Sequence, residues 1–356
     1  MEIKVFSPRE FDKIEYSWKK LECGPDMTAF QLYDWYKNIN ALYFKEKTKK
    51  IFRRWVYVLA EENGEPVMIA PIQIVKISIG HKQLGLPIAF YLIGRQGYTD
   101  YLNFIYKDFS EEAVKAILGY LEDEYKIHGC CFEQLLETTA LYKFLSSNFK
   151  HEKYECDCAA LLLPETFEEY KKRLSKSTRQ NIRTAINRQR RDNKHLAHEM
   201  VYEIDSKTAD MLMRIRAERL PKKKRDCYKH ASFKGKIYNI LRDLLVKMFS
   251  AKHDIMHDNC NPWCFLVKDG ERIAGFYWGI TNDTRTAYYV ILAGLEEAYA
   301  WYSPNISHFC LYLEELYASG NVSVKVIDFT RGGETYKKDL GAEKKTAYRI
   351  DFKISG

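Results

Sequence analysis

The run Tyr302-Ser-Pro-Asn-Ile-Ser307 combines residue types that begin a helix and can hold an anion. A helix start leaves backbone N–H groups without intrahelical partners and carries the positive end of the helix dipole, so a pyrophosphate can bind there. Proline suits the first turn, and serine hydroxyls can add donors. The simpler interpretation is a common Ser-Pro helix cap. The run therefore indicates a candidate anion site made by Ser303, Pro304, Asn305, Ile306 and Ser307.

A carboxylate and a phenol follow this run at positions where they could transfer protons. Asp328 ends an otherwise apolar stretch that should form a strand, and Gly332-Gly333 allows a sharp turn into a short helix that presents Tyr336. A carboxylate can take up a proton and a phenol can supply one. The alternatives are a carboxylate that caps the next helix and an aromatic residue of the core. Lys337 would contact a phosphate or lie on a solvated helix face.

The segment 171–191 is dense in lysine and arginine, as in surfaces that bind nucleic acid or phosphate-rich ligands. However, Leu174, Ile182 and Ile186 leave an apolar stripe, and no aromatic residues are interleaved for base stacking. The pattern favours a docked helix with a solvated basic face, with nucleic acid binding as the alternative.

Histidine and cysteine side chains with some metal-ligand character occur between His253 and Cys264. Pro262 and Trp263 separate the two cysteines, and the spacing does not match a common structural zinc site, so we expect no metal. The sequence has neither a Gly-x-Ser-x-Gly elbow nor a Walker Gly-Lys-Ser/Thr motif, which disfavours serine hydrolases and P-loop NTPases.

The 356 residues suggest about two domains at roughly 150 residues each. Hydrophobic residues make up 46% and charged residues 29%, which excludes disordered and collagen-like chains. A net charge of +8 favours anionic ligands, and nine scattered cysteines indicate reduced thiols. No run approaches the ~18 apolar residues of a membrane helix, and the N-terminus mixes both charge signs, unlike a signal peptide. We expect a cytoplasmic protein without membrane insertion.

The order of expected elements indicates an internal repeat. The hairpin turns Glu62-Asn-Gly-Glu65 and Lys268-Asp-Gly-Glu271 each precede a similar series of strands and helices, so two mixed α+β domains are expected, 1–158 and 159–356. Chance similarity of two mixed halves is the alternative. Expected helices cover 11–22, 110–121, 140–148, 171–191, 206–220, 234–250 and 303–318. Expected strands cover 2–6, 54–79, 130–135, 154–163, 263–267, 273–280, 285–292, 324–329 and 346–352.

The run Tyr302 to Ser307, followed by Asp328-Phe-Thr-Arg-Gly332 and Tyr336-Lys-Lys-Asp-Leu-Gly341, resembles the CelD-like branch of the GNAT acyltransferases, which is similar to the FemABX peptidyltransferases. The resemblance covers most of the chain loosely. It implies two tandem GNAT-like domains, each a mixed, mostly antiparallel sheet flanked by helices. The C-terminal domain would hold acyl-CoA, while the N-terminal one has lost that role. Asn305 departs from the glycine usual in the family.

The resemblance implies an N-acyltransferase that moves an acetyl or other acyl group from acyl-CoA to a small-molecule amine. Asp328 would be the base and Tyr336 the acid for the departing thiolate, while Ser303 to Ser307 and Lys337 would bind CoA. The acceptor would enter between the domains at Asp100, Tyr101 and Arg219. Two alternatives stay open: a FemABX-like transferase that takes its acyl group from aminoacyl-tRNA, and a non-catalytic scaffold that binds CoA or another anion. The acceptor, the acyl chain length and the oligomeric state stay open as well.

Overall fold

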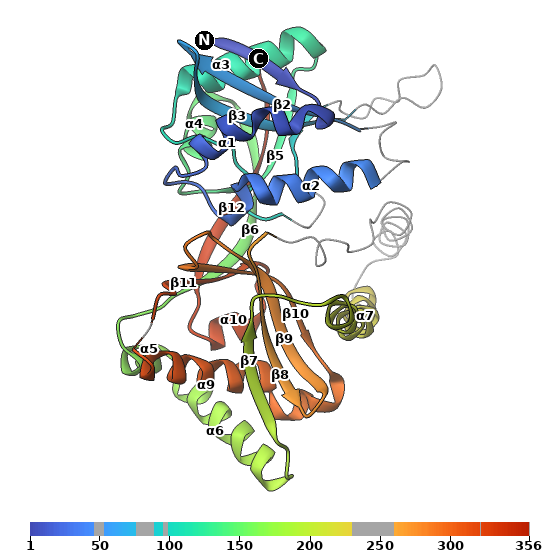
Figure 1. Ribbon diagram of the computed structural model, residues 1–356, viewed down its shortest axis with the longest axis vertical. Coiled ribbons are helices and arrows are strands. Elements are labelled where there is room, and N and C mark those ends of the chain that lie inside the picture. Colours follow the sequence, from blue (N-terminus) through green and yellow to red (C-terminus); the bar gives the residue numbers. More distant parts are fainter. Residues whose placement is uncertain (46–52, 76–88, 95–98, 230–259, 321, 356) are drawn as a thin grey trace. The chain divides into compact units, whose positions relative to one another are not determined.

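The computed structural model describes residues 1–45, 53–75, 89–94, 99–229, 260–320 and 322–355 (Figure 1). The chain divides into two compact units. Unit 1 comprises Met1–Cys158, Arg331–Gly333 and Lys344–Gly356, and unit 2 comprises Ala159–Thr330 and Glu334–Glu343. Each unit is an α+β structure with its own hydrophobic core, as expected from the sequence.

Unit 1 is built on a mixed, mostly antiparallel sheet whose strand order is β1-β2-β3-β4-β5-β12-β6. The hairpin between β2 and β3 turns at Asn63 and Gly64, both with positive φ, as the sequence predicts. The strands are β1 (Glu2–Phe6), β2 (Arg53–Glu62), β3 (Glu65–Val75), β4 (Ala89–Leu92), β5 (Gly129–Leu136), β6 (His151–Leu162) and β12 (Glu343–Lys353). The helices are η1 (Pro8–Ile14), α1 (Glu15–Leu21), η2 (Ala29–Gln31), α2 (Tyr33–Lys45), α3 (Glu111–Tyr125) and α4 (Ala140–Asn148).

Unit 2 repeats this plan with the strand order β6-β11-β10-β9-β8-β7. Neighbouring strands from β7 to β10 are antiparallel, whereas β10 and β11 are parallel. Figure 1 shows α7 and α9 on opposite sides of strands β8 to β10. The strands are β7 (Leu196–Val201), β8 (Pro262–Asp269), β9 (Arg272–Thr281), β10 (Ala287–Leu295) and β11 (Val326–Arg331). The helices are α5 (Phe167–Arg173), α6 (Lys176–Arg191), α7 (Ser206–Lys229), η5 (Glu297–Tyr302), α9 (Pro304–Ala318) and α10 (Thr335–Asp339).

The basic segment forms two helices instead of one. Helix α5 ends at Arg173, and α6 begins after Ser175, whose hydroxyl accepts a hydrogen bond from the Thr178 N–H at 3.0 Å. Helix α6 buries Ala185 and exposes Arg190, as expected for a docked helix with a solvated basic face.

The C-terminal strand differs from the expected domain assignment. The sequence places it in the second domain, 159–356, but β12 pairs antiparallel with β5 of unit 1, from Ala347 opposite Leu136 to Lys353 opposite Gly129. Figure 1 shows the red strand β12 beside β5. Ile350 and Phe352 complete the core of unit 1, which explains why this strand leaves the unit that precedes it in the chain.

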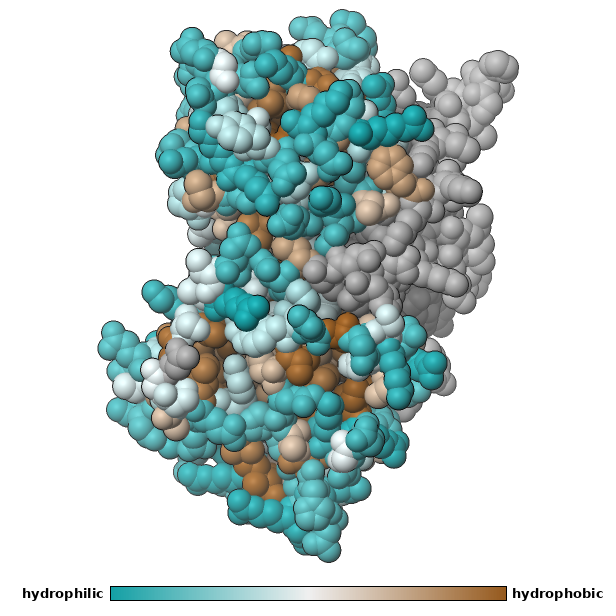
Figure 2. Space-filling view, in the orientation of Figure 1, coloured by the Kyte–Doolittle hydropathy of each residue, from teal (hydrophilic) through white to brown (hydrophobic). Residues whose placement is uncertain are grey.

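Hydrophilic residues predominate on the face shown in Figure 2. Among the described residues, the large hydrophobic side chains that are exposed are Met1, Tyr16, Phe44, Tyr154, Leu162 and Trp301. Among the described helices, none has both the length and the apolar character needed to cross a membrane.

Candidate functional site

Strands β10 and β11 part from each other inside unit 2. Their parallel register covers Ala287 to Tyr289 and ends where Tyr289 lies opposite Asp328, although both strands continue. A bulge follows in β10 after Val290, and the Thr330 hydroxyl donates to the Val290 carbonyl at 2.7 Å. A side chain thus bridges the strands where backbone pairing has ended. Beyond Tyr289, the register of β10 with β11 does not continue along the described residues.

Asp328 lies at the point where the strands part and is only 1% exposed. Its Oδ1 accepts a hydrogen bond from the Thr330 N–H at 2.8 Å, which supports the left-handed backbone of Thr330, at φ 51°. The carboxylate therefore stabilises a local turn in β11 and not the start of α10. Strained backbone of this kind concentrates at functional sites, although it does not identify their chemistry.

Tyr336, on α10, belongs to an aromatic cluster in unit 2. Its ring stacks on Tyr277 at 6.0 Å between centroids and meets Phe329 edge-on. Burial raises the pKa of both tyrosine hydroxyls, so each holds its proton at neutral pH. The Tyr277 hydroxyl is fully buried and has no hydrogen-bond partner among the described residues. Two neutral phenols therefore lie side by side, one of them with an unused donor.

Lys337 is buried, at 3% exposure, and does not form the solvated helix face considered from the sequence. Its ammonium group pairs with Glu334 at 3.0 Å and donates to the Thr330 carbonyl at 3.4 Å. The positive charge is therefore directed at the turn that Asp328 also supports. A buried ammonium group needs such partners because desolvation is expensive.

The start of α9 has the backbone geometry expected of an anion site. Ser303 precedes the helix with left-handed angles (φ 43°, ψ 49°), is exposed, and makes no side-chain capping hydrogen bond. The first helical hydrogen bond runs from the Ser307 N–H to the Ser303 carbonyl at 3.0 Å. The N–H groups of Asn305 and Ile306 lie before that bond, so an anion could accept from them. The residues at this helix start thus fit a phosphate.

The Ser307 hydroxyl faces inward, whereas the sequence suggested that it could donate to a bound anion. Its hydroxyl is buried, donates to the Ser303 carbonyl at 3.0 Å and accepts from the Gln189 amide at 3.2 Å. The Gln189 oxygen lies 3.0 Å from Nε2 of His308, whose pKa burial lowers to about 4. His308 is therefore neutral at pH 7, and it secures α6 to the first turn of α9.

The Asn305 side chain also points inward, toward strands β9 and β10, and not into the solvent at the start of α9. Its Nδ2 donates to the Phe276 carbonyl at 3.2 Å and to the Gly294 carbonyl at 3.0 Å, so it ties α9 to β9 and β10. A Cβ atom at Gly275 would lie 1.8 Å from Asn305 Oδ1, so this contact needs glycine there. Asn305 Oδ1 is buried and has no partner among the described residues. The residue that departs from the family pattern thus has a structural role.

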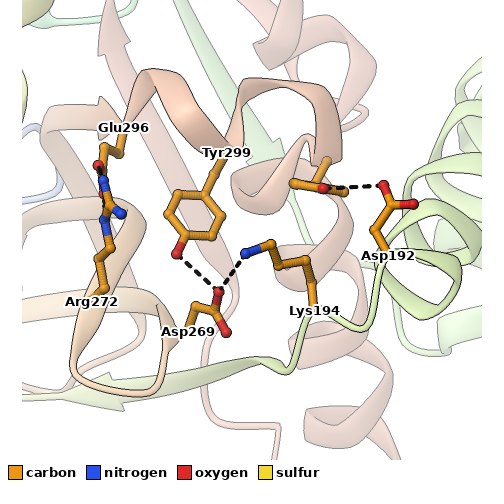
Figure 3. Close-up of polar contacts among 7 residues, drawn as sticks. Asp192, Lys194, Asp269, Arg272, Glu296 and Tyr299 are labelled. Atoms are coloured by element: carbon orange, nitrogen blue, oxygen red, sulfur yellow. Dashed lines mark hydrogen bonds and ion pairs between the residues drawn. The ribbon is translucent and has the colours of Figure 1, made fainter.

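Polar contacts hold the turn η5, which leads into α9 (Figure 3). Asp269 accepts from the Tyr299 hydroxyl at 2.9 Å and pairs with Lys194 at 3.3 Å. The Tyr302 hydroxyl donates to Asp192 at 3.1 Å, while Arg272 and Glu296 form a further ion pair across the turn. These contacts fix the entry to the helix before any ligand binds.

Asp100 and Tyr101 are buried in unit 1, at 4% and 2% exposure. Asp100 pairs with Arg331, and the Gln134 amide bridges these two side chains. In its hydrogen-bonding orientation, the amide nitrogen donates to Asp100 Oδ1 at 3.0 Å and the amide oxygen accepts from Arg331 Nη1 at 2.8 Å. Lys345 lies 4.4 Å from the centre of the Tyr101 ring. Tyr101 and Gln134 both have positive φ. A strained, charged and buried cluster is therefore present.

Several functional candidates were missed from the sequence. Arg331 lies within the quoted motif Asp328 to Gly332 and could have been identified there, whereas Gln134 and Tyr277 have no sequence signal of their own. Arg219 lies on α7, but its side chain is outside the described part. His253 is also outside it, and the described residues contain no group of three or more His, Cys, Asp or Glu side chains suited to a metal ion.

Comparisons with known proteins agree with this architecture. Residues 176–338 match the family model of the acetyltransferase (GNAT) domain. The crystal structure of FemX is similar over 98% of this chain and 97% of its own, at 13% identity and a TM-score of 0.56. The C-terminal domain of a putative lysylphosphatidylglycerol synthetase from Agrobacterium fabrum matches over 97% and 93% of the two chains, at 9% identity and a TM-score of 0.49. No curated protein sequence matches the chain.

The family model spans the part of unit 2 that contains the parting strands, the start of α9, Asp328 and Tyr336. The likeness to FemX extends over nearly the whole of both chains and concerns the fold. Residues 176–338 therefore match the acetyltransferase (GNAT) domain, and the fold of the whole chain is similar to that of FemX.

Proposed function

We propose that the chain transfers an acyl group, in the simplest case acetyl, from acyl-CoA to the nitrogen of an amine. The observation that carries this proposal is the parting of β10 and β11 at Tyr289 and Asp328, within the segment that matches the GNAT domain. The edge of β10 beyond this pairing could accept an extended ligand by backbone hydrogen bonding. The pantetheine arm of acyl-CoA is such a ligand.

The spacing along β10 supports this placement. Asn305 contacts Gly294, which lies four residues beyond Val290, or about 13 Å at ~3.3 Å per residue. The pyrophosphate would accept from the N–H groups of Asn305 and Ile306, with Ser303 beside it. The arm would follow β10 from there toward the parting, bringing the thioester to the neighbourhood of Asp328.

The residues around the parting can supply both proton transfers. The amine nitrogen forms a bond to the thioester carbon, the carbon–sulfur bond breaks, the nitrogen loses a proton and the sulfur gains one. Tyr336, protonated because burial raises its pKa, would donate to the sulfur. Asp328 would accept the nitrogen's proton, directly or through water. Lys337 would hold the turn of Thr330 in place and would not touch the phosphate.

We place the recognition of the acceptor at Asp100 and Tyr101. The support is their burial in a charged cluster with Arg331 and the positive φ of Tyr101, because strain that the surroundings maintain concentrates at binding sites. Arg219 belongs to the same proposal. An amine acceptor suits a carboxylate, although Asp100 would then share its charge between the acceptor and Arg331.

One observation favours a second donor. FemX shares the fold of the whole chain, and a FemABX-like enzyme would take its acyl group from aminoacyl-tRNA. The exposed basic side chains of α6 are compatible with binding an RNA backbone. In that case the same Asp328 and Tyr336 would serve a different leaving group, the ribose oxygen of the tRNA.

Calorimetric titration of the full chain with CoA, acetyl-CoA, pantetheine and aminoacyl-tRNA tests the donor. The proposal predicts heat and a raised melting temperature with CoA and acetyl-CoA, and a much weaker effect with pantetheine, which lacks the pyrophosphate. Absence of both effects at millimolar acetyl-CoA would end the acyl-CoA proposal. Stabilisation by aminoacyl-tRNA alone would favour the FemX-like donor, and CoA binding without turnover on any amine would favour a scaffold.

A further inference from the structure

Helix α7 carries an arginine on the side that packs against the sheet of unit 2. Ala209 and Leu212 are fully buried, and Arg216 follows them at the spacing of one helix face. Arg216 is partly buried, whereas Arg214 is exposed. Helix α7 contacts β10, and Figure 1 shows it on the side of strands β8 to β10 that lies away from α9. The Arg216 side chain therefore points toward the sheet.

The Arg216 guanidinium group has no counter-ion within the described part of the chain. No hydrogen bond or ion pair joins it to another described residue, and burial alone lowers its pKa. An arginine side chain nevertheless keeps its charge in proteins. A positive charge that is partly buried without a partner costs free energy, because it has lost water and gained nothing in return. An anion bound from solution would remove this cost.

The sheet face on the α7 side contains a second donor without a partner. On β9, Tyr277 packs against Phe309 of α9, so the next residue, Trp278, points to the opposite face of the sheet. Trp278 is 1% exposed, and its Nε1 has no hydrogen-bond acceptor among the described residues. Buried indole N–H groups usually have an acceptor. Two donors on the α7 side of the sheet thus lack one.

Asp328 points to the same face of the sheet as Trp278. Its neighbours on β11, Ile327 and Phe329, both belong to the core on the α9 side, so the carboxylate between them is directed to the α7 side. Trp278 lies opposite Leu292, just beyond the bulge that follows the parting of β10 and β11. The two donors and the proposed base therefore lie on one side of the sheet.

We propose that the amine acceptor carries a carboxylate, which binds to the guanidinium group of Arg216 and the indole N–H of Trp278. A guanidinium group matches a carboxylate through two parallel hydrogen bonds. Arg216 supplies one positive charge beside the apolar Ala209 and Leu212, which suits a singly charged carboxylate better than a phosphate dianion. With the carboxylate held on the α7 side, the amine would be presented to Asp328 on that same side. An amino acid is the simplest molecule of this class.

Urea unfolding of the full chain without ligand tests whether the Arg216 charge lacks a partner. Arg216→Met removes the charge and keeps a flexible apolar side chain, so it should raise the urea midpoint. Arg214→Met, which removes a charge from the exposed side of the same helix, should leave the midpoint nearly unchanged. A lower midpoint for Arg216→Met would overturn the inference, because the guanidinium group would then already be stabilised in the free protein.

Thermal melting of the full chain with each of the twenty amino acids tests the ligand. We expect at least one of them to stabilise the wild type and Arg214→Met. Its amide derivative, in which a neutral carboxamide replaces the carboxylate, should bind at least about tenfold more weakly. Arg216→Met should lose this preference for the carboxylate. No stabilisation by any amino acid, or equal stabilisation by the acid and its amide, would overturn the inference.

The inference rests on the proposed acyl transfer for the role of the bound molecule, but neither measurement needs an acyl donor. Carboxylate binding that depends on Arg216, in a protein that fails to bind CoA, would support the anion site and end the acyl-CoA proposal. Transfer from acetyl-CoA to amino acids and to their amides at equal rates, in the wild type and in Arg216→Met alike, would overturn the inference and leave the acyl transfer intact.

Discussion

A carboxylate placed at Ser303 should weaken CoA binding without destabilising the protein. Ser303 precedes α9, is exposed, and makes no side-chain capping hydrogen bond. Asp and Asn both tolerate its left-handed backbone. In Ser303→Asp a negative charge would lie at the positive end of the helix dipole, where it stabilises the free helix by about 0.3–1 kcal/mol. The same charge would repel a pyrophosphate.

The size of that repulsion follows from Coulomb's law. A carboxylate about 5 Å from a group of charge about −2 is repelled by roughly 1.5–3 kcal/mol when the dielectric constant is between that of water and half that value. This repulsion corresponds to a roughly 10- to 100-fold larger dissociation constant for CoA. Because Ser303 is exposed, added salt should reduce the effect.

Calorimetry with CoA at low and high salt, together with urea unfolding of the free protein, measures both effects. Ser303→Asn is the matched control, since it has nearly the same shape without the charge, and it should bind CoA as the wild type does. Equal CoA affinities for the Asp and Asn variants would refute a pyrophosphate at this helix start. A loss of affinity accompanied by lower stability would indicate a general disturbance of α9 instead.

Once turnover is found, Tyr336→Phe should reduce the rate by about 10²- to 10⁴-fold with CoA affinity nearly unchanged, and full turnover would exclude this phenol as the acid. Asp328→Asn should lower the rate and alter its dependence on pH, whereas a purely structural carboxylate would change mainly the urea midpoint. Gly275→Ala should destabilise unit 2 by about 1–3 kcal/mol because of the clash with Asn305, and the loss should be smaller in an Asn305→Ala background; a loss in the double variant equal to the sum of the two single losses would contradict the contact. Burial, and secondarily His198, lowers the pKa of His308 to about 4. Between pH 4 and 6.5 this side chain therefore binds a proton in the unfolded chain more readily than in the folded one. The wild type should therefore lose up to about 3 kcal/mol more stability than His308→Gln as the pH falls from 6.5 to 4, and parallel urea midpoints for the two proteins over that range would contradict this.

The local elements were largely predictable because their signals are local. The turns at Asn63-Gly64 and Gly270 have the expected structures, and the helix expected over 110–121 is present as α3. The first predicted helix, 11–22, instead begins as the 3-10 turn η1 before α1. The elements α2, β4 and β7 were not predicted, and the helix expected at 234–250 lies outside the described residues.

Long-range contacts explain what the sequence could not predict. The pairing of β12 with β5 joins residues far apart in the chain, and no local pattern specifies that partner. The inward direction of Ser307 depends on Gln189, and the burial of Lys337 depends on the turn at Thr330. The motif containing Asp328 indicated where to look, but only the fold shows that Arg331 from the same motif pairs with Asp100. Side-chain direction was the missing information.

Amide hydrogen exchange at the start of α9 tests the central claim most directly. The N–H groups of Asn305 and Ile306 precede the first helical hydrogen bond, so in the free protein they should exchange rapidly. Saturating CoA should slow both by at least about tenfold if the pyrophosphate accepts from them, while the amide of Glu112 in the first turn of α3 should not change. Unchanged exchange at Asn305 and Ile306, in a sample shown by calorimetry to be saturated with CoA, would contradict the account.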